Sequence, residues 1–149
     1  MTLNIRTAVP DDMATVHMML SLLARHHGDE AKISIAELNR QIFDLRKGRI
    51  LVAAEEQELL GYALLLAFPN MVTGKSRFEV EHVFVMEWRR RIGIGRALIN
   101  AARVIAQSEG AECLRIGTHA DNFGAQQAYR DMGFVQMPQA GPRFNIPLD

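Results

Sequence analysis

Cysteine is almost absent from this chain, which has one, Cys113, among 149 residues. A single cysteine excludes an internal disulfide and a metal site built on several cysteines. Proteins from reducing compartments use cysteine in this way, so we predict a cytoplasmic location and no metal. An excess of charge is absent too, because 17 basic residues balance 17 acidic ones. Since nucleic-acid-binding domains are usually basic, no nucleic-acid partner is expected.

Long hydrophobic runs are also missing from the sequence. The longest apolar run, Ala63 to Phe68, is far too short to cross a bilayer. The first residues lack a basic region followed by an apolar stretch, so no signal peptide is expected. We therefore expect no membrane association. The length suits one domain, residues 1–149, and 48% hydrophobic residues suffice for an ordinary globular core.

Apolar periodicity predicts a mixed order of strands and helices. Alternating runs predict strands at 3–6, 50–54, 60–68, 77–85, 113–118, 134–137 and 143–146. Helical spacing and capping residues predict helices after Asp12, after Ser34, at 96–109 and from Asn122 to Met132. Hairpin strands come first and strand–helix units follow. This order predicts an α+β fold: a mixed, mostly antiparallel central sheet with helices on both faces.

The strand predicted at 77–85 carries several ionisable side chains. Strict alternation would place residues 79, 81, 83 and 85 on one face, and residues 78, 80, 82 and 84 on the other. His82 would then face away from Glu81 and act as a core or supporting histidine.

The segment after this strand, RRIGIGRAL, predicts an anion site. Gly93 and Gly95 permit a tight bend, and the N–H groups that follow open a helix whose positive end attracts phosphate. Arg90, Arg91 and Arg96 add positive charge. A dinucleotide-binding fingerprint would need glycine at position 98, which is leucine, so the segment is not of that type.

Two motifs resemble those of the GNAT superfamily of N-acetyltransferases. Residues 85–98 are similar to its acyl-CoA signature, whose core [QR]-x-x-G-x-[GA] is matched by Arg90, Gly93 and Gly95. A second pattern, N-x-x-A-x-x-x-Y-x-x-x-G-F, is matched by Asn122, Ala125, Tyr129, Gly133 and Phe134. The chain departs from the family at Glu87, where many members have proline.

The resemblance implies that acetyl-coenzyme A (acetyl-CoA) is the cofactor. In similar enzymes the strand before the signature separates from the next strand, and the pantetheine arm inserts between them. The positions carried over as cofactor-binding are Phe84, Val85, Arg90, Arg91, Ile92, Gly93, Ile94, Gly95, Arg96, Asn122, Ala125 and Tyr129. A backbone N–H near Val85 would polarise the thioester carbonyl.

The resemblance also implies catalytic roles. Glu81 matches a family glutamate that takes a proton from the amine, and Glu79 is the reserve candidate. Tyr129 matches the tyrosine that gives a proton to the coenzyme A sulfur. Two alternatives stay open from the residues alone: Glu81 as an ion-pair partner of an arginine, and Tyr129 as a packing residue. His26, Asp29, Glu30 and Glu79 are the candidates for contacts with the acceptor.

The sequence thus predicts an acetyl-CoA-dependent N-acetyltransferase. The acetyl group would move to a primary amine by direct attack of the amine on the thioester, and a small-molecule amine is the expected acceptor. Two alternatives are a protein N-acetyltransferase and a module that senses acyl-CoA without turnover. Because members of the superfamily often form dimers, a homodimer is also expected.

Overall fold

The computed structural model describes residues 2–90 and 92–148. Arg91, one of the predicted cofactor-binding residues, therefore lies outside the described part of the chain. Two compact units make up the structure, Met1–Gly117 and Thr118–Asp149. Each is described by itself below, and the single domain expected from the sequence stays a prediction.

The first unit contains a five-stranded sheet in the order β1-β2-β3-β4-β5. Its neighbours are antiparallel except for β4 and β5, which run parallel. The strands are β1 (Leu3–Thr7), β2 (Arg49–Glu55), β3 (Glu58–Pro69), β4 (Ser76–Val85) and β5 (Cys113–Ile116). The helices are α1 (Met13–His26), α2 (Ile35–Asn39) and α3 (Ile94–Ser108), with a short π-helical turn η2 (Arg40–Asp44) and 3-10 turns η1 (Pro10–Asp12) and η3 (Glu87–Arg89).

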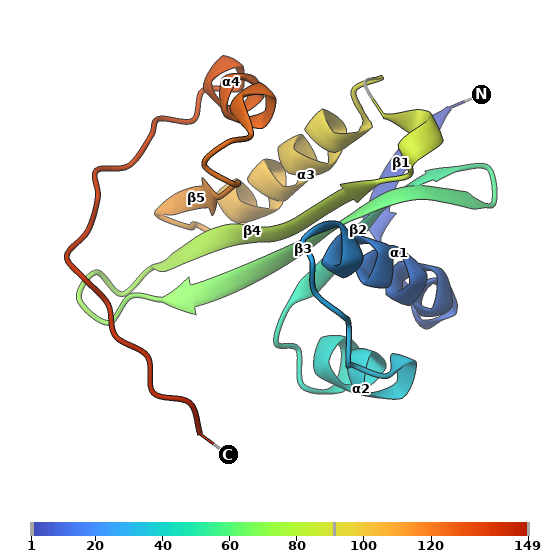
Figure 1. Cartoon of the computed structure of the whole chain (residues 1–149), viewed down its shortest axis with the longest axis horizontal. Coiled ribbons are helices and arrows are strands. Elements are labelled where there is room, and N and C mark those ends of the chain that lie inside the picture. The colour runs from blue at the N-terminus through green and yellow to red at the C-terminus, as the bar shows by residue number, and fades with distance from the viewer. Residues whose placement is uncertain (1, 91, 149) are drawn as a thin grey trace. The chain divides into compact units, whose positions relative to one another are not determined.

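Helices cover both faces of this sheet, as Figure 1 shows. On one face α3 packs through Ile94, Leu98, Ala102 and Ala106 against strand residues that include Leu65 and Val80. On the other face α1 and α2 pack through Met13, Val16, Met19 and Leu38 against strand residues that include Val52, Tyr62 and Phe84. The predicted α+β fold, with a mostly antiparallel sheet between helices, is confirmed.

Polar side chains fix the starts of two helices on the second face. The carboxylate of Asp12, just before α1, accepts two hydrogen bonds from Arg6, at 2.7 and 3.0 Å, and one from the Val9 N–H at 2.8 Å. The Arg6 guanidinium holds the pKa of Asp12 below its usual value. Ser34 caps α2 by accepting the N–H of Glu37, as its position in the sequence predicts.

The second unit contains one helix, α4 (Phe123–Asp131), within its described residues. The strands predicted at 134–137 and 143–146 are wrong, because residues 134–148 form neither helix nor strand. Alternation was a poor guide there, since a strand needs a partner to receive its backbone hydrogen bonds. No helix in the described part of the chain is long and apolar enough to cross a membrane.

A β-bulge at Glu81 changes the faces of β4. Leu64 pairs with His82 and Leu65 pairs with Val80, so Glu81 is an extra residue without a partner on β3. Before the bulge, Phe78 and Val80 lie on the α3 face. After it, the α3 face is taken by Val83 and Val85, and Phe84 lies on the α1 face.

The strict alternation predicted for residues 77–85 is therefore wrong beyond Val80. His82, which bonds to Tyr62 of the α1-side core, lies on the α1 face. Alternation counted from Val80 assigns Glu81 to the same face. The bulge thus removes the reason to expect that Glu81 and His82 face away from each other.

Gly61 lets β3 and β4 approach closely at the carboxyl end of β4. A Cβ atom at position 61 would lie 2.5 Å from the carbonyl oxygen of Phe84 and 3.2 Å from the Cα of Val85. Both contacts are to backbone, which a rotamer change cannot move aside. Glycine at this position is therefore a packing requirement for the carboxyl end of β4.

Replacing Gly61 with alanine should lower the free energy of unfolding by about 2 kcal/mol, because the added methyl group forces β3 and β4 apart. Gly117→Ala is the matched control, since no heavy atom lies within 4 Å of a Cβ there. Urea unfolding of both variants measures the difference. Equal stability of the two variants would show that the β3–β4 contact is not tight.

Candidate functional site

The candidate site lies where β4 and β5 part. β5 pairs with β4 from Arg77 to Val80 and, within the described residues, no further. The last residues of β4, Glu81–Val85, therefore have β3 on one side and no strand on the other. This is the separation of strands that the sequence resemblance implies for the pantetheine arm.

The backbone of Val85 points into this gap. The N–H of the next residue, Met86, donates to the carbonyl of Leu60 on the β3 side, at 2.8 Å. Because successive residues of an extended strand direct their backbone groups to opposite sides, both polar groups of Val85 point away from β3. Val85 thus offers an N–H donor at the open edge, where the sequence predicts a polarising donor for the thioester carbonyl.

The Arg90 side chain contacts the end of β4 on its open side, away from β3. Its Nε donates to the carbonyl oxygen of Val85 at 3.0 Å. Its guanidinium lies 5.6 Å from the centroid of the Phe84 ring, a cation–π distance. The sequence predicts that Arg90 contacts phosphate. In the structure its Nε is already engaged, so this arginine also fixes the strand end that borders the gap.

The amino-terminal turn of α3 supplies backbone N–H groups that have no partner among the described residues. Gly93 stands at the N-cap with φ at 85°, a left-handed conformation that favours glycine, and no side chain in the described residues caps the helix. Ile94 turns its side chain into the core, where it is 2% exposed. Arg96 and Ile92 are exposed at this turn. Free N–H groups at a positive helix end suit a phosphate group.

Gly95 places the first turn of α3 next to the end of β4. A Cβ at position 95 would meet Val85 Cγ2 at 3.8 Å and Val83 Cγ1 at 3.9 Å, both ordinary contacts. The described part of the protein therefore has room for alanine at this position, as the [GA] of the motif allows. Of the two glycines, Gly93, with its left-handed φ, is the one that the turn requires.

Glu81 and Glu79 occupy the α1 face of β4. Glu81 is exposed and forms no ion pair with any described residue, which removes the support for its alternative role as an arginine partner. Glu79 has such a partner, because its Oε2 lies 3.8 Å from Nε of Arg77. Glu81 is therefore the freer of the two carboxylates that the sequence singled out.

The pairing of Tyr62 with His82 was not predicted from the sequence. The Tyr62 hydroxyl lies 3.0 Å from Nδ1 of His82, and the two rings meet edge to face at 6.0 Å. Burial raises the pKa of Tyr62 and lowers that of His82. One signal was available: Tyr62 interrupts an aliphatic run, and a buried tyrosine hydroxyl needs a partner.

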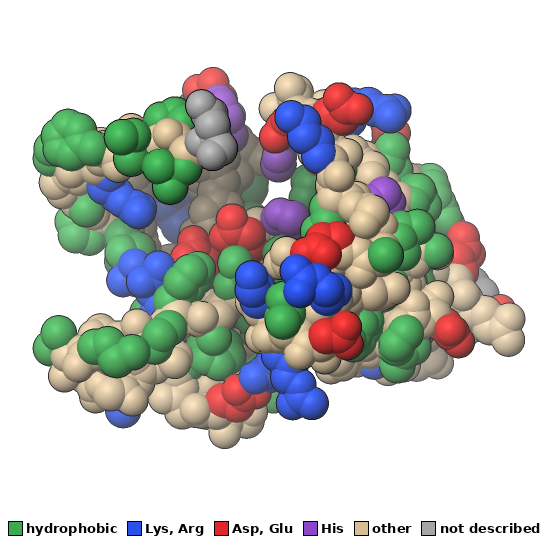
Figure 2. Space-filling model, turned by 90° about the horizontal axis from the view of Figure 1, so that it is seen from below, with side chains coloured by type: hydrophobic (Ala, Val, Ile, Leu, Met, Phe, Trp, Pro, Cys, Tyr) green, Lys and Arg blue, Asp and Glu red, His purple; other side chains and the backbone are tan. Residues whose placement is uncertain are grey.

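The acceptor candidates His26, Asp29 and Glu30 lie at the carboxyl end of α1 and just beyond it, and all are exposed. Their neighbour His27 lies close enough to β4 for its charge to lower the pKa of His82. Figure 2, seen from below Figure 1, shows acidic and histidine side chains next to one another near the middle of this face. No hydrogen bond or ion pair joins the three candidates to Glu81 within the described residues.

The remaining predicted residues lie in the second unit. Asn122 caps α4, because its Oδ1 accepts the N–H of Ala125 at 3.1 Å. Tyr129 is partly buried and packs edge to face on Phe134, with ring centroids 6.0 Å apart. Burial raises the pKa of Tyr129, so its hydroxyl stays protonated over a wider pH range. The roles of these residues toward the cofactor stay predictions.

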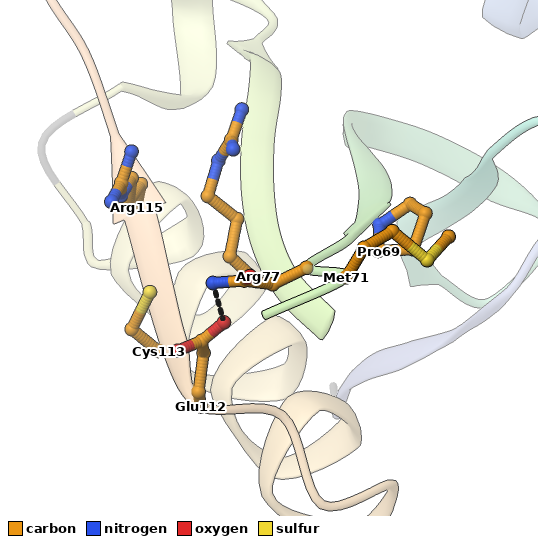
Figure 3. Close-up of a pocket in the computed structure, with 7 residues that line it drawn as sticks. Pro69, Met71, Arg77, Glu112, Cys113 and Arg115 are labelled. Atoms are coloured by element: carbon orange, nitrogen blue, oxygen red, sulfur yellow. Dashed lines mark hydrogen bonds between the residues drawn. The ribbon is translucent and has the colours of Figure 1, made fainter. Parts of the chain in front are cut away.

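A separate hollow of about 300 Å³ lies at the amino ends of β4 and β5 (Figure 3). It is lined by Pro69, Asn70, Met71, Arg77, Glu112, Cys113 and Arg115. Asn70 donates to Glu112 at 3.0 Å, and Arg77 lies over the ring of Phe68 at 4.4 Å. Since the gap at Glu81–Val85 follows at the other end of β4, this hollow is not part of the candidate site.

Comparison with known proteins identifies the family to which this arrangement belongs. A family model described as "Acetyltransferase (GNAT) family" matches residues 16–134, which include the β4–α3 turn and α4. The chain belongs to the GNAT acetyltransferase family. Acetyl transfer is the activity that this membership implies.

Relatives of known sequence agree with the GNAT assignment. A protein named uncharacterized N-acetyltransferase YhfO, from Bacillus subtilis, is 26% identical over 135 residues, which cover 90% of this chain and 91% of that protein. A mycothiol acetyltransferase from Renibacterium salmoninarum is 24% identical and is matched over 90% of this chain, but over 41% of its own length.

Solved structures show the same fold. A possible acetyltransferase from Clostridium difficile has a TM-score of 0.82 at 20% identity, with 99% of each chain covered. A ribosomal-protein-alanine N-acetyltransferase from Brucella melitensis has a TM-score of 0.74 at 19% identity, covering 97% of this chain and 100% of that one. At these identities the likeness concerns the fold alone.

Gly95→Ala and Gly93→Ala probe this turn in the GNAT protein. Gly95→Ala is the control and should keep wild-type stability and acetyl-CoA affinity, because the family motif accepts alanine there and the added methyl group meets ordinary contacts. Gly93→Ala should weaken acetyl-CoA binding about tenfold or more and lower the free energy of unfolding by about 1 kcal/mol, because a Cβ disfavours the left-handed φ on which the turn depends. Calorimetric titration and thermal melts measure the two effects. Unchanged acetyl-CoA affinity in Gly93→Ala would argue against a ligand at this turn.

Proposed function

We propose that this chain is an acetyl-CoA-dependent N-acetyltransferase that acts on a small primary amine. The observation that carries the proposal is the juxtaposition of two features. β4 parts from β5 after Val80, and the uncapped amino end of α3 begins nine residues after Val85 (94 − 85). A strand gap for an extended arm thus leads directly to a helix end suited to phosphate.

The chain's own groups suit the parts of acetyl-CoA. N–H groups at 93–96, with the charge of Arg96, would hold the pyrophosphate, and the open backbone groups of β4 would bind the amides of the pantetheine arm. When bound, acetyl-CoA supplies a thioester whose acetyl carbon bonds to the amine nitrogen as its bond to sulfur breaks. The Val85 N–H is the donor available to the carbonyl oxygen.

Glu81 would prepare the amine. A primary amine is largely protonated near neutral pH and must lose a proton before its lone pair is free to attack. An exposed carboxylate with no ion-pair partner in the described structure can accept that proton, directly or through a water molecule. Glu79 shares its face of β4 and adds negative charge that attracts an ammonium group.

Tyr129 would return a proton to the departing sulfur. Its raised pKa keeps the hydroxyl protonated, which is the state that a proton donor requires. A thiol has a pKa of about 8.5, so a thiolate is already a tolerable leaving group. The tyrosine would therefore speed the reaction without being indispensable.

Acetyl-CoA should raise the melting temperature of the protein by mass action, whereas NADH and ATP at the same concentration should not. At one hundred times its dissociation constant, the ligand should stabilise the folded state by about 2.7 kcal/mol. A thermal-shift scan measures this effect. No shift at saturating acetyl-CoA would contradict the assignment of the cofactor.

Glu81→Gln should lower kcat with a reactive amine by about a hundredfold or more, because the variant keeps the shape of the side chain but cannot accept a proton. Tyr129→Phe should lower kcat by about tenfold, since the thiolate still leaves without help. Thiol release from acetyl-CoA measures both rates. The matched control is Glu58→Gln, an exposed glutamate at the start of β3.

Full activity in Glu81→Gln would remove Glu81 as the base, and loss of activity in Glu79→Gln alone would transfer the role to Glu79. Tight acetyl-CoA binding, with no thiol released from it in the presence of any amine, would favour a sensor of acyl-CoA over an enzyme.

A further inference from the structure

A hydrogen bond from a buried tyrosine determines which ring nitrogen of His82 carries the proton. Tyr62 is 0% exposed, and Nδ1 of His82 is the one hydrogen-bond partner that its hydroxyl has among the described residues. A buried hydroxyl that does not donate its proton is costly. Because burial also raises the pKa of Tyr62, the hydroxyl keeps that proton. Tyr62 therefore donates to Nδ1.

This hydrogen bond determines what the other ring nitrogen can do. A neutral imidazole carries one proton, and a nitrogen that accepts a hydrogen bond does not hold it. Nε2 of His82 is consequently the protonated nitrogen and acts as a donor. Nε2 has no hydrogen-bond acceptor among the described residues. Because it is also not one of the fully buried side-chain atoms without a partner, it is open to solvent. An N–H donor is thus available to a ligand.

The donor is one residue from the proposed base. Alternation counted from Val80 assigns Glu81 to the face of β4 on which His82 bonds Tyr62. Burial and the nearby charge of His27 both lower the pKa of His82, which favours the neutral ring. In that state His82 donates through Nε2 and cannot accept a proton there. It complements Glu81 instead of replacing it.

The charge on this face decides which acceptor group suits the donor. Glu81 is negative and has no ion-pair partner among the described residues, whereas Glu79 lies 3.8 Å from Arg77. Asp29 and Glu30 add negative charge just beyond α1, whose last turn carries Arg25. A carboxylate or phosphate of the acceptor would be repelled, whereas an ammonium group would be attracted. The group that matches an N–H donor in this setting is an uncharged oxygen.

We infer that His82 determines specificity by donating its Nε2–H to a hydroxyl oxygen close to the reacting amine, so that the acceptor is an amino alcohol or an amino sugar. The inference rests on the proposed function, because it places the reacting amine at Glu81. It names a substrate class that the fold by itself does not select.

Matched acceptors test this inference. The rates to compare are kcat/KM for 2-amino-2-deoxyglucose and for cyclohexylamine, which lacks the hydroxyl groups, in wild type and in His82→Phe. Wild type should prefer the amino sugar, and His82→Phe should reduce that preference about tenfold by slowing the amino sugar alone. Dividing one preference by the other cancels the intrinsic reactivity of each amine. Tyr62→Phe, which releases the ring, should reduce the preference in part.

His17→Gln is the control, because Nε2 of His17 lies 2.7 Å from the carbonyl oxygen of Ile33 and is already engaged. It should leave the preference unchanged. Nitrogen-15 NMR of the imidazole rings in wild type provides a readout that needs neither activity nor a variant. It should show a neutral His82 that carries its proton on Nε2 at neutral pH.

The rates and the NMR spectra each give a result that can overturn the inference. An equal preference in wild type and His82→Phe, a wild type that favours cyclohexylamine or a carboxylate-bearing amino acid, or a proton on Nδ1 would each overturn the inference and leave the proposed function standing. If the protein binds acetyl-CoA but no amine causes thiol release, both the inference and the proposed function are overturned.

Discussion

The extra residue in β4 is the constraint on which the proposed site depends. β3 and β4 pair along most of their length, and the register slips by one residue at Glu81. Because side chains alternate along a strand, this slip lets β4 present Val80 and Val83 to α3 while Glu81 and His82 share the opposite face. Gly61 keeps β3 against β4 at the carboxyl end of β4, where it pairs with Val85. Hydrophobic side chains therefore pack against both faces of the sheet, although the ionisable Glu81 has been inserted into β4.

The same strand end also organises the cofactor side of the site. β5 stops pairing at Val80, so the backbone of Val85 faces an open edge. Arg90 then holds the Val85 carbonyl, and the chain turns through Gly93 into α3. The proposed donor for a thioester carbonyl, the proposed helix end for a pyrophosphate and the proposed carboxylate for an amine therefore all depend on residues 81–96. One short segment positions the chemistry, which explains why its motif is so informative in the sequence.

The sequence was sufficient for the fold class, and it pointed to the candidate site, because both have local signatures. The glycines of the RRIGIG segment, the helical stripe after them and the alternating strands could all be read without tertiary information. The orientation of His82 could not, because alternation assumes regular pairing and a bulge exists only between two strands. The Tyr62–His82 bond was hidden for the same reason, since it joins residues 20 apart in sequence. The strands expected after Phe134 failed because alternation does not provide a partner strand.

The central claim is that acetyl-CoA binds along the open edge of β4 with its phosphates at the start of α3. The most direct measurement is a crystal structure of the full chain with acetyl-CoA bound. The account predicts the pyrophosphate against the backbone of residues 93–96, the thioester carbonyl within hydrogen-bond distance of the Val85 N–H, and the acetyl carbon on the side of the gap nearest Glu81. A cofactor bound elsewhere, such as the hollow beside Cys113, or a thioester remote from Val85, would contradict it.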